Sequence, residues 1–262
     1  MAILLKSRKE IDKLREAGRL VAQTFEVLRP YVKPGTTTAE LDKIAEDFIR
    51  SHDATPIYKG YGGHPGGNGR PAIPPFPGTI CASVNEVICH GIPSDKKVLQ
   101  DGDIIGVDIG VILNGWVGDS CMTYAVGNVD EESQRLMEVT HKSMELGIEQ
   151  ARHGNHLGDI GAAIQTYAES HGFSVVRDLV GHGVGRSLHE DPNVPHFGRP
   201  GTNKRIQKGM VFTIEPMINV GTYKTETLAD RWTIVTADRK RSAQYEHSLA
   251  ITDGAPELLT VL

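Results

Sequence analysis

The sequence predicts an α+β fold built from two similar halves, and three observations support it. The order helix, helix, strand and hairpin can be read twice along the 262 residues, with a divide near Asn128. Gln100-Asp101-Gly102 is followed six residues after its glycine by Asp108, and Gln207-Lys208-Gly209 is followed in the same way by Glu215. Both segments place a carboxylate in an apolar, strand-like stretch. We therefore expect one domain made of a repeated unit.

The composition excludes several classes of protein. Of the residues 39% are hydrophobic and 23% charged, and the net charge of −5 gives no bulk attraction to DNA or to an anionic membrane. No run approaches the ~20 apolar residues of a membrane helix. Lys6 and Arg8 interrupt the apolar start, so we expect no signal peptide. The odd number of cysteines, three without C-x-x-C spacing, favours reduced thiols and a cytoplasmic location.

Capping residues mark the expected helices of the first half. Ser7 and Glu10 form an S-x-x-E capping box ahead of apolar residues at helical spacing. The turn Lys33-Pro34-Gly35 ends that helix, and a second one is expected to begin near Thr37 with Glu40 in its first turn. Because the order of elements repeats after a divide near Asn128, the two halves are expected at about 1–127 and 128–262.

A glycine- and proline-rich segment interrupts the first half. Residues 60–78 contain seven Gly and five Pro in nineteen positions, a composition that favours a loop over a helix or a central strand. A strand-like run, Thr79–Val84, follows at once, so the segment is too short to be a linker between domains.

The strongest local signal is a hairpin. Asn114-Gly115 separates Ile104–Leu113 from Trp116–Val126, and this dipeptide is typical of a two-residue hairpin turn. The second half is expected to contain a helix capped by Asp130, a helix over about Leu157–His171, and strands near Val175–Val180, Met210–Glu215, Arg231–Thr236 and Ala243–Thr252.

Acidic side chains in these strand-like segments indicate a metal site, because Asp and Glu are rarely buried without a partner. With Asn114 and Gly115 as the loop, Gly110 lies opposite Asp119, and Asp108 points to the same face as Gly110. The β-carbons of the two aspartates are then within ~7–8 Å of each other. The adjoining strand residues include no Lys or Arg, so a cation between the acids is expected.

Charge balance predicts two divalent cations if four such acids converge. Two ions ~3.5–4 Å apart suit hydrolysis, because they lower the pKa of a water and polarise a carbonyl. An oxygen-rich set with one imidazole favours Mn, Fe or Co, and zinc is also compatible. Four separate salt-bridged carboxylates remain the alternative. The four acids are Asp108, Asp119, Glu215 and Glu246.

Three histidines are candidates for the same site, although each taken alone is more often structural. His182 is flanked by glycines that let the backbone approach another group closely, His189 follows seven residues later, and His90 ends a strand-like run. His189-Glu190 begins like H-E-x-x-H but lacks the second histidine, which excludes a zincin helix.

Several motifs together resemble one family, and they extend over almost the whole chain. They are Ser83–Gly91 (SVNEVICHG), the spacing of Asp108 and Asp119, Gly181–Gly185 (GHGVG), Phe212–Pro216 (FTIEP) and Gln244–His247 (QYEH). The chain resembles the type I methionine aminopeptidases of the short bacterial kind. The resemblance implies the pita-bread fold, in which two pseudo-symmetric α+β halves, with antiparallel sheet inside and helices outside, enclose a dinuclear metal site.

The resemblance also implies an activity, the removal of the initiator methionine from the N-terminus of nascent polypeptides when the next residue is small. Glu215 would then act as a proton shuttle, His189 would hydrogen-bond the scissile amide, and His90 would contact the peptide. The implied metal ligands are Asp108, Asp119, His182, Glu215 and Glu246.

Further residues match the family's methionine pocket and a monovalent-cation site. The pocket positions are Tyr58, Tyr61, His64, Cys81, Leu188 and Trp232, and the cation positions are Asn85, Val87 and Ser242. His64 and Leu188 stand where many relatives carry aromatic residues, and Tyr58 stands where some carry a smaller one. Pro65–Pro77 resembles an insertion beside the pocket.

The sequence also leads to expectations about binding partners and leaves two alternative functions open. We expect a monomer that acts on the N-termini of nascent chains and, from its net charge, does not bind DNA or membranes. Docking at the ribosome near the exit tunnel is a further candidate interaction. A proline-directed aminopeptidase or prolidase of the same fold is the enzymatic alternative. A non-catalytic peptide-binding relative is the other alternative.

Overall fold

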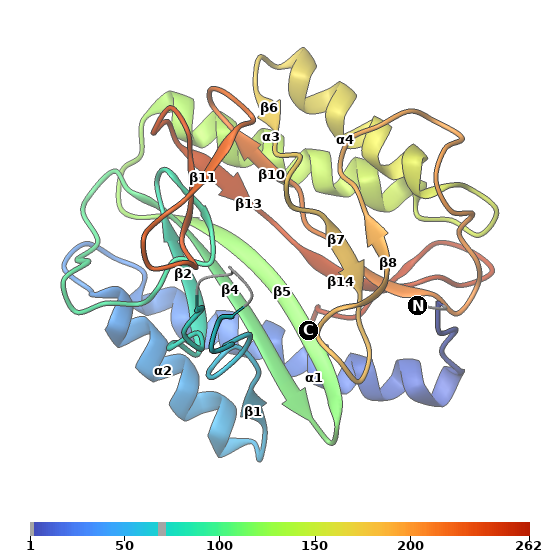
Figure 1. Cartoon of the computed structure of the whole chain (residues 1–262), viewed down its shortest axis with the longest axis horizontal. Helices are drawn as coiled ribbons and strands as arrows, with labels where there is room; N and C mark the ends of the chain where they lie inside the picture. The colour runs from blue at the N-terminus through green and yellow to red at the C-terminus, as the bar shows by residue number, and fades with distance from the viewer. Residues whose placement is uncertain (1–2, 68–71) are drawn as a thin grey trace.

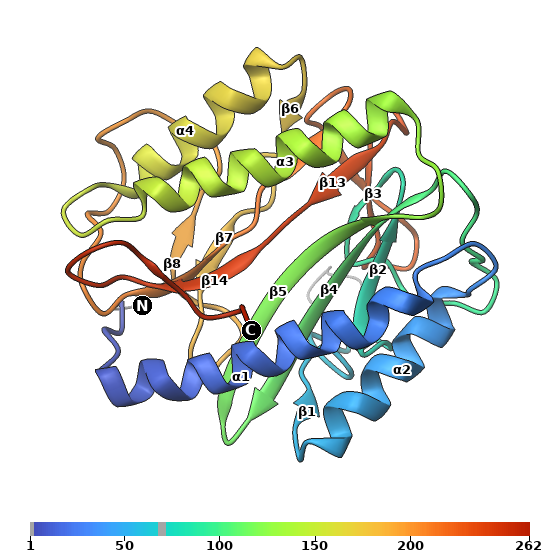
Figure 2. The same cartoon turned by 180° about the vertical axis from the view of Figure 1, so that it is seen from behind.

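The computed structural model describes residues 3–67 and 72–262, and it has helices on one side of curved antiparallel strands. Figure 2 shows the α-helices in front of the strands, and Figure 1 shows the opposite, open face of the strands. Residues 68–71 of the loop expected at 60–78 lie outside the described residues. No helix in the described ranges is long and apolar enough to cross a membrane.

The expected helices of both halves are present, and the three with an expected cap begin at it. Ser7 and Glu10 form the capping box of the first helix, and the Thr37 hydroxyl accepts a hydrogen bond from the Glu40 N–H at the start of the second. The Asp130 carboxylate accepts from the Ser133 N–H at the start of the third. The helices are α1 (Arg8–Leu28), η1 (Arg29–Tyr31), α2 (Thr38–Ser51), α3 (Glu131–Gln150) and α4 (Leu157–Ser170).

Helices α2 and α4 end in the same way, which supports the repeated unit. Each is followed by a histidine whose ring folds back onto the last turn. Nδ1 of His52 lies 2.9 Å from the Phe48 carbonyl oxygen, and Nδ1 of His171 lies 2.8 Å from that of Tyr167. Each histidine also packs against the aromatic ring of that same residue.

The strands form four small sheets, and most of their pairing is antiparallel and non-local. One sheet has the order β1-β4-β2 with β5 paired to β4, and another has the order β15-β14-β9-β7-β8. The other two are β13-β10-β6 and β11-β12-β3. The strands are β1 (Thr55–Pro56), β2 (Ile80–Val84), β3 (Val87–Cys89), β4 (Ile104–Leu113), β5 (Trp116–Ala125), β6 (Ser174–Val175), β7 (Gly181–Gly183), β8 (Glu190–Val194), β9 (Val211–Ile214), β10 (Met217–Asn219), β11 (Thr225–Thr227), β12 (Ile234–Thr236), β13 (Ser242–Gln244), β14 (His247–Ala250) and β15 (Glu257–Leu258).

The register of the β4–β5 hairpin is as predicted. Leu113 pairs with Trp116, and Gly110 pairs with Asp119. Asn114 and Gly115 both have positive φ, which is the conformation that a type I′ turn requires. The turn dipeptide therefore determines which face of the hairpin carries its acids.

Two acids do not lie inside strands as expected. Glu215 follows the end of β9, and Glu246 lies between β13 and β14. Pro216, which has no N–H, follows Glu215. The Glu246 N–H donates to the carbonyl of Cys121 in β5, so the chain leaves one sheet at this point and enters another. The expected single strand over Ala243–Thr252 is therefore two strands.

Side chains of β5 and β14 join the two halves along a seam. The Thr123 hydroxyl donates to the Gln244 carbonyl at 2.6 Å, and the Ser248 hydroxyl donates to the Asp119 carbonyl at 2.7 Å. The Ser120 hydroxyl donates to the carbonyl of Glu246. These buried bonds set β5 directly beside the turn that carries Glu246.

Separate hydrophobic clusters support the two halves. One lies under α1 and α2 and includes Leu28, Leu41 and Val107, all fully buried. The other lies under α3 and α4 and includes Leu136 and Phe212. In each half, the strands that carry the acids thus have one face covered by that half's helix pair, which leaves the other face free to form a site.

A nearly buried ion pair ties the N-terminal segment to the first residue of β8. Nζ of Lys6 lies 2.6 Å from Oε2 of Glu190, and their side chains are 6% and 14% exposed. Oε1 of Glu190 accepts hydrogen bonds from the N–H groups of Arg186 and Ser187. The Glu190 carboxylate therefore holds the irregular segment that leads to His189.

We predict that Lys6→Met lowers the midpoint of thermal unfolding by about 5–10 °C. Removing one partner of a largely buried ion pair costs about 3 kcal/mol, because the remaining charge keeps its desolvation penalty. Differential scanning calorimetry measures the effect. The control is Lys43→Met, which breaks an exposed pair with Asp47 on α2 and should change the midpoint little. Equal shifts in the two variants would contradict the prediction.

Candidate metal centre

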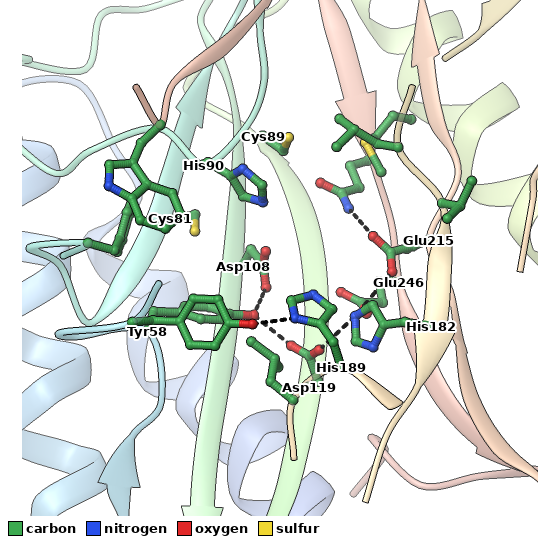
Figure 3. A pocket seen from close by; sticks show the side chains of 18 residues that line it. Tyr58, Cys81, Cys89, His90, Asp108, Asp119, His182, His189, Glu215 and Glu246 are labelled. Carbon is green, nitrogen blue, oxygen red and sulfur yellow. Dashed lines mark hydrogen bonds and ion pairs between the residues drawn. The ribbon is translucent and has the colours of Figure 1, made fainter. Parts of the chain in front are cut away.

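A cavity of about 750 Å³, including its open mouth, lies on the open face of the strands and receives side chains from both halves. Figure 3 shows its acids and histidines pointing toward one another from the two sets of strands. Most residues expected at the site line it. They are Tyr58, Tyr61, Cys81, His90, Asp108, Asp119, His182, Leu188, His189, Glu215, Trp232 and Glu246.

The first half contributes two aspartates from the β4–β5 hairpin. The hydroxyl of Tyr58 lies 2.5 Å from Oδ1 of Asp108 and 2.6 Å from Oδ1 of Asp119. One hydroxyl reaches both carboxylates, so the aspartates are diagonal neighbours on one face, as the hairpin register predicted.

The second half contributes an imidazole and two glutamates. Nε2 of His182, in β7, lies 3.5 Å from Oδ2 of Asp119 and 3.5 Å from Oε1 of Glu215. Its Nδ1 lies 3.1 Å from the Gly183 carbonyl, which turns Nε2 toward the acids. Asp119, His182 and Glu246 each offer one ligand atom, and these atoms lie within 4.8 Å of one another.

Thr213 connects two of these groups. Its hydroxyl donates to Oε1 of Glu215 at 2.7 Å and accepts from the backbone N–H of His182 at 3.0 Å. Gln244 donates to the other oxygen, Oε2, at 3.3 Å. Glu215 is thus oriented through both of its oxygens by neutral groups.

The cavity strongly disfavours the ionised form of its carboxyl groups. Burial, followed by the charge of Asp119, raises the pKa of Asp108 well above its usual range. Burial raises the pKa of Glu215 and of Glu246 in the same direction, and Asp119 adds to both shifts. Burial also raises the pKa of Asp119 to about 6, against the opposing effect of the Tyr58 hydrogen bond.

This donor set fits a divalent metal. Among the cavity-lining side chains in the described parts of the chain, none is a Lys or an Arg. Oε1 of Glu246 is buried and has no hydrogen-bond partner within these parts. Carboxylate oxygens with one imidazole suit divalent transition ions. A cation at this position would neutralise the acids and supply the partner that Glu246 lacks.

His189 and His90 are neutral side chains beside the acids. Burial lowers the pKa of each to about 4. The Tyr61 hydroxyl lies 2.6 Å from Nδ1 of His189. When Tyr61 donates this bond, the neutral imidazole carries its hydrogen on Nε2 and can donate it to a ligand in the cavity.

An apolar wall completes the cavity. Phe76 packs edge-on against Trp232, with ring centroids 5.4 Å apart, and Nε1 of Trp232 donates to the Pro74 carbonyl at 2.7 Å. The base of the glycine- and proline-rich loop is therefore fastened to the wall. Lining residues that were not expected from the sequence are Phe76, Cys89, Leu179, Val180, Met217 and Gln244.

His64 does not lie in this wall, contrary to the expectation. It is exposed, its backbone pairs in both directions with Ile73, and its Nδ1 accepts from the Gly66 N–H. These local bonds hold it in the loop, outside the cavity. Gln244 could have been anticipated, because it lies two residues before Glu246 in the same motif.

The residues expected to hold a monovalent cation are not among those that line the cavity. The Asn85 side chain donates to Asp103 at 2.7 Å and accepts from the Ile104 N–H at 3.1 Å. The Ser242 N–H donates to the Asn85 carbonyl at 2.9 Å, and Val87 begins β3 beside them. Both polar atoms of the Asn85 side chain thus already make hydrogen bonds, which leaves backbone carbonyl oxygens as the possible ligands of a cation.

Comparisons with known proteins agree on one family. Residues 12–253 match the metallopeptidase family M24. The methionine aminopeptidase of Clostridium acetobutylicum is 49% identical over 259 residues, which cover 99% of each chain. Methionine aminopeptidase 1 of Bacillus subtilis is 50% identical over 258 residues, covering 98% of this chain and 99% of that one.

A solved structure extends this likeness to three dimensions. The methionine aminopeptidase of Rickettsia prowazekii superposes with a TM-score of 0.93 at 44% identity, over 99% of this chain and 100% of that one. The chain therefore belongs to metallopeptidase family M24 and, within it, to the methionine aminopeptidases, and its fold is the pita-bread fold.

We predict that neutral His90 makes the protein less stable in acid. The unfolded chain protonates residue 90 near pH 6.5, whereas the native pKa is about 4. Between these values the unfolded state binds more protons, so the free energy of unfolding rises with pH and is lost as pH falls from 6.5 toward 4. His90→Gln should flatten this slope by up to about 1.4 kcal/mol per pH unit.

Urea denaturation in chelator at several pH values measures both slopes. His153→Gln, an exposed position after α3, is the control and should keep the wild-type slope. A slope unchanged by His90→Gln would contradict the assignment of a neutral His90.

Proposed function

We propose that this chain is a metal-dependent aminopeptidase that hydrolyses the N-terminal methionine of nascent polypeptides when the second residue is small. The observation that carries the proposal is the meeting of four carboxylates and His182 at the floor of a cavity with an apolar wall. The chain is similar over nearly its full length to proteins named methionine aminopeptidase.

The residues that would hold two divalent ions are those with raised carboxyl pKa values and the imidazole beside them. Such ions, when bound, supply an activated water and polarise the scissile carbonyl. Cobalt, manganese and iron fit the oxygen-rich set best, and zinc is compatible. The ligands are Asp108, Asp119, His182, Glu215 and Glu246.

The chain's own side chains would supply the proton transfers. Glu215 is oriented by Thr213 and Gln244, so it can accept a proton from the attacking water and pass it to the departing amine. His189, with its hydrogen on Nε2, would donate to the oxygen of the tetrahedral intermediate. His90 would contact the peptide beyond the scissile bond.

The apolar wall would bind the methionine side chain. Phe76, Leu188 and Trp232 offer the hydrophobic surface, and Cys81 and Tyr61 line the same cavity. Binding the side chain in this wall holds the first peptide bond at the metal centre.

Other assignments extend the same proposal. A monovalent cation would be held by backbone carbonyls near Asn85, Val87 and Ser242. The enzyme would act as a monomer on N-termini as they emerge from the ribosome.

A proline-directed function has no specific support, because prolidase from Pyrococcus furiosus, with 18% identity and a TM-score of 0.73, shares the fold alone.

We predict that the metal-loaded protein releases methionine from Met-Ala-Ser and not from Met-Lys-Ser. Glu215→Gln should lower kcat by about 10²–10⁴-fold, because it removes the proton acceptor. Asp108→Asn should abolish turnover by weakening metal binding. Liquid chromatography of the peptide products measures both effects.

Chelation provides the second arm of this test. Exhaustive removal of metal should stop the reaction, and adding Mn²⁺ or Co²⁺ should restore it. Full turnover in chelator would overturn the proposal, and a preference for Xaa-Pro peptides would move the protein to the proline-directed peptidases. A protein that binds peptide without any turnover would instead be a binding module.

A further inference from the structure

We propose that Tyr58 is a positioning residue of the metal centre, whose phenol holds the Asp108–Asp119 pair and so sets the affinity of the site for divalent ions. The proposal rests on the metal site of the proposed function and assigns Tyr58 a task different from lining a methionine pocket.

The phenol is aimed at the acids and not at the apolar wall. Its oxygen lies 2.5 Å from Oδ1 of Asp108 and 2.6 Å from Oδ1 of Asp119, and the residue is 7% exposed. Figure 3 shows the Tyr58 ring extending toward both aspartates. Its polar end therefore belongs to the carboxylate cluster.

The backbone around Tyr58 fixes this position. Strand β1, which precedes Tyr58, pairs with β4, and the Ile57 N–H donates to the Gly110 carbonyl at 3.0 Å. A β-carbon at Gly110 would lie 3.0 Å from the Tyr58 ring and 2.4 Å from Ile57. The ring thus needs the bare backbone at Gly110, the residue that pairs with Asp119.

One hydroxyl hydrogen cannot serve two carboxylates at once. It satisfies one Oδ1 atom, and the other faces the lone pairs of the phenol oxygen, which is repulsive while both acids are ionised. A cation shared by the two aspartates removes this conflict, and the hydroxyl then orients one of them. Outer partners that orient metal ligands typically change affinity by about 10–100-fold.

Isothermal titration of the metal-free protein with Mn²⁺ tests the proposal without any turnover. Tyr58→Phe keeps the ring and removes only the hydroxyl, and we expect Mn²⁺ to bind at least about 10-fold more weakly. Tyr61→Phe is the matched control, because its hydroxyl hydrogen-bonds to His189 and, within the described residues, to no carboxylate. It should leave the Kd for Mn²⁺ within about 2-fold, since it touches no ligand of the proposed site.

Gly110→Ala gives a second route to the same result, because it keeps the hydroxyl and displaces the ring. It should weaken Mn²⁺ binding in the wild-type background and have much less effect in the Y58F background. Thermal unfolding in chelator verifies that each variant is folded.

An unchanged or tighter Kd for Mn²⁺ in Tyr58→Phe would overturn the proposal and leave the proposed function intact. A wild-type protein that binds Mn²⁺ with Tyr58-dependent affinity but never cleaves Met-Ala-Ser would support this inference and overturn the function. A wild-type protein that binds no divalent ion would overturn both.

Discussion

The gathering of like charges in a cavity shielded from water is the constraint on which the rest of the structure depends. Four carboxylates from two halves of the chain meet where burial raises their pKa values. Such a cluster is unfavourable by itself and becomes favourable when cations neutralise it. The carboxylates whose ionised form is most disfavoured by burial thus lie where a metal ion can neutralise them.

The fold holds this cluster by covering only one face of the strands with helices. The buried bonds from Thr123 and Ser248 fix β5 against the segment around Glu246, so the acids of the two halves cannot drift apart. The Lys6–Glu190 pair fixes the segment before His189, because the Glu190 carboxylate also accepts from the N–H groups of Arg186 and Ser187. Both supports join residues that are far apart in sequence.

Short sequence signals predicted the hairpin register, the shared face of its two aspartates and the starts of the helices. Asn114-Gly115 determined the hairpin register and hence the shared face of Asp108 and Asp119, and the capping boxes located the helix starts. Positions that depend on long-range contacts were not predictable. The Tyr58 contact with the aspartates requires β1 to pair with β4, and Glu246 interrupts its expected strand because its N–H pairs across the seam with β5.

Anomalous diffraction from crystals grown with Mn²⁺ shows directly whether the four carboxylates and His182 bind a pair of metal ions. We expect two manganese peaks about 3.5–4 Å apart, with oxygens of Asp108, Asp119, Glu215 and Glu246 and a nitrogen of His182 as ligands. Peaks elsewhere on the molecule, or an empty cavity with a Lys or Arg side chain among the acids, would contradict it.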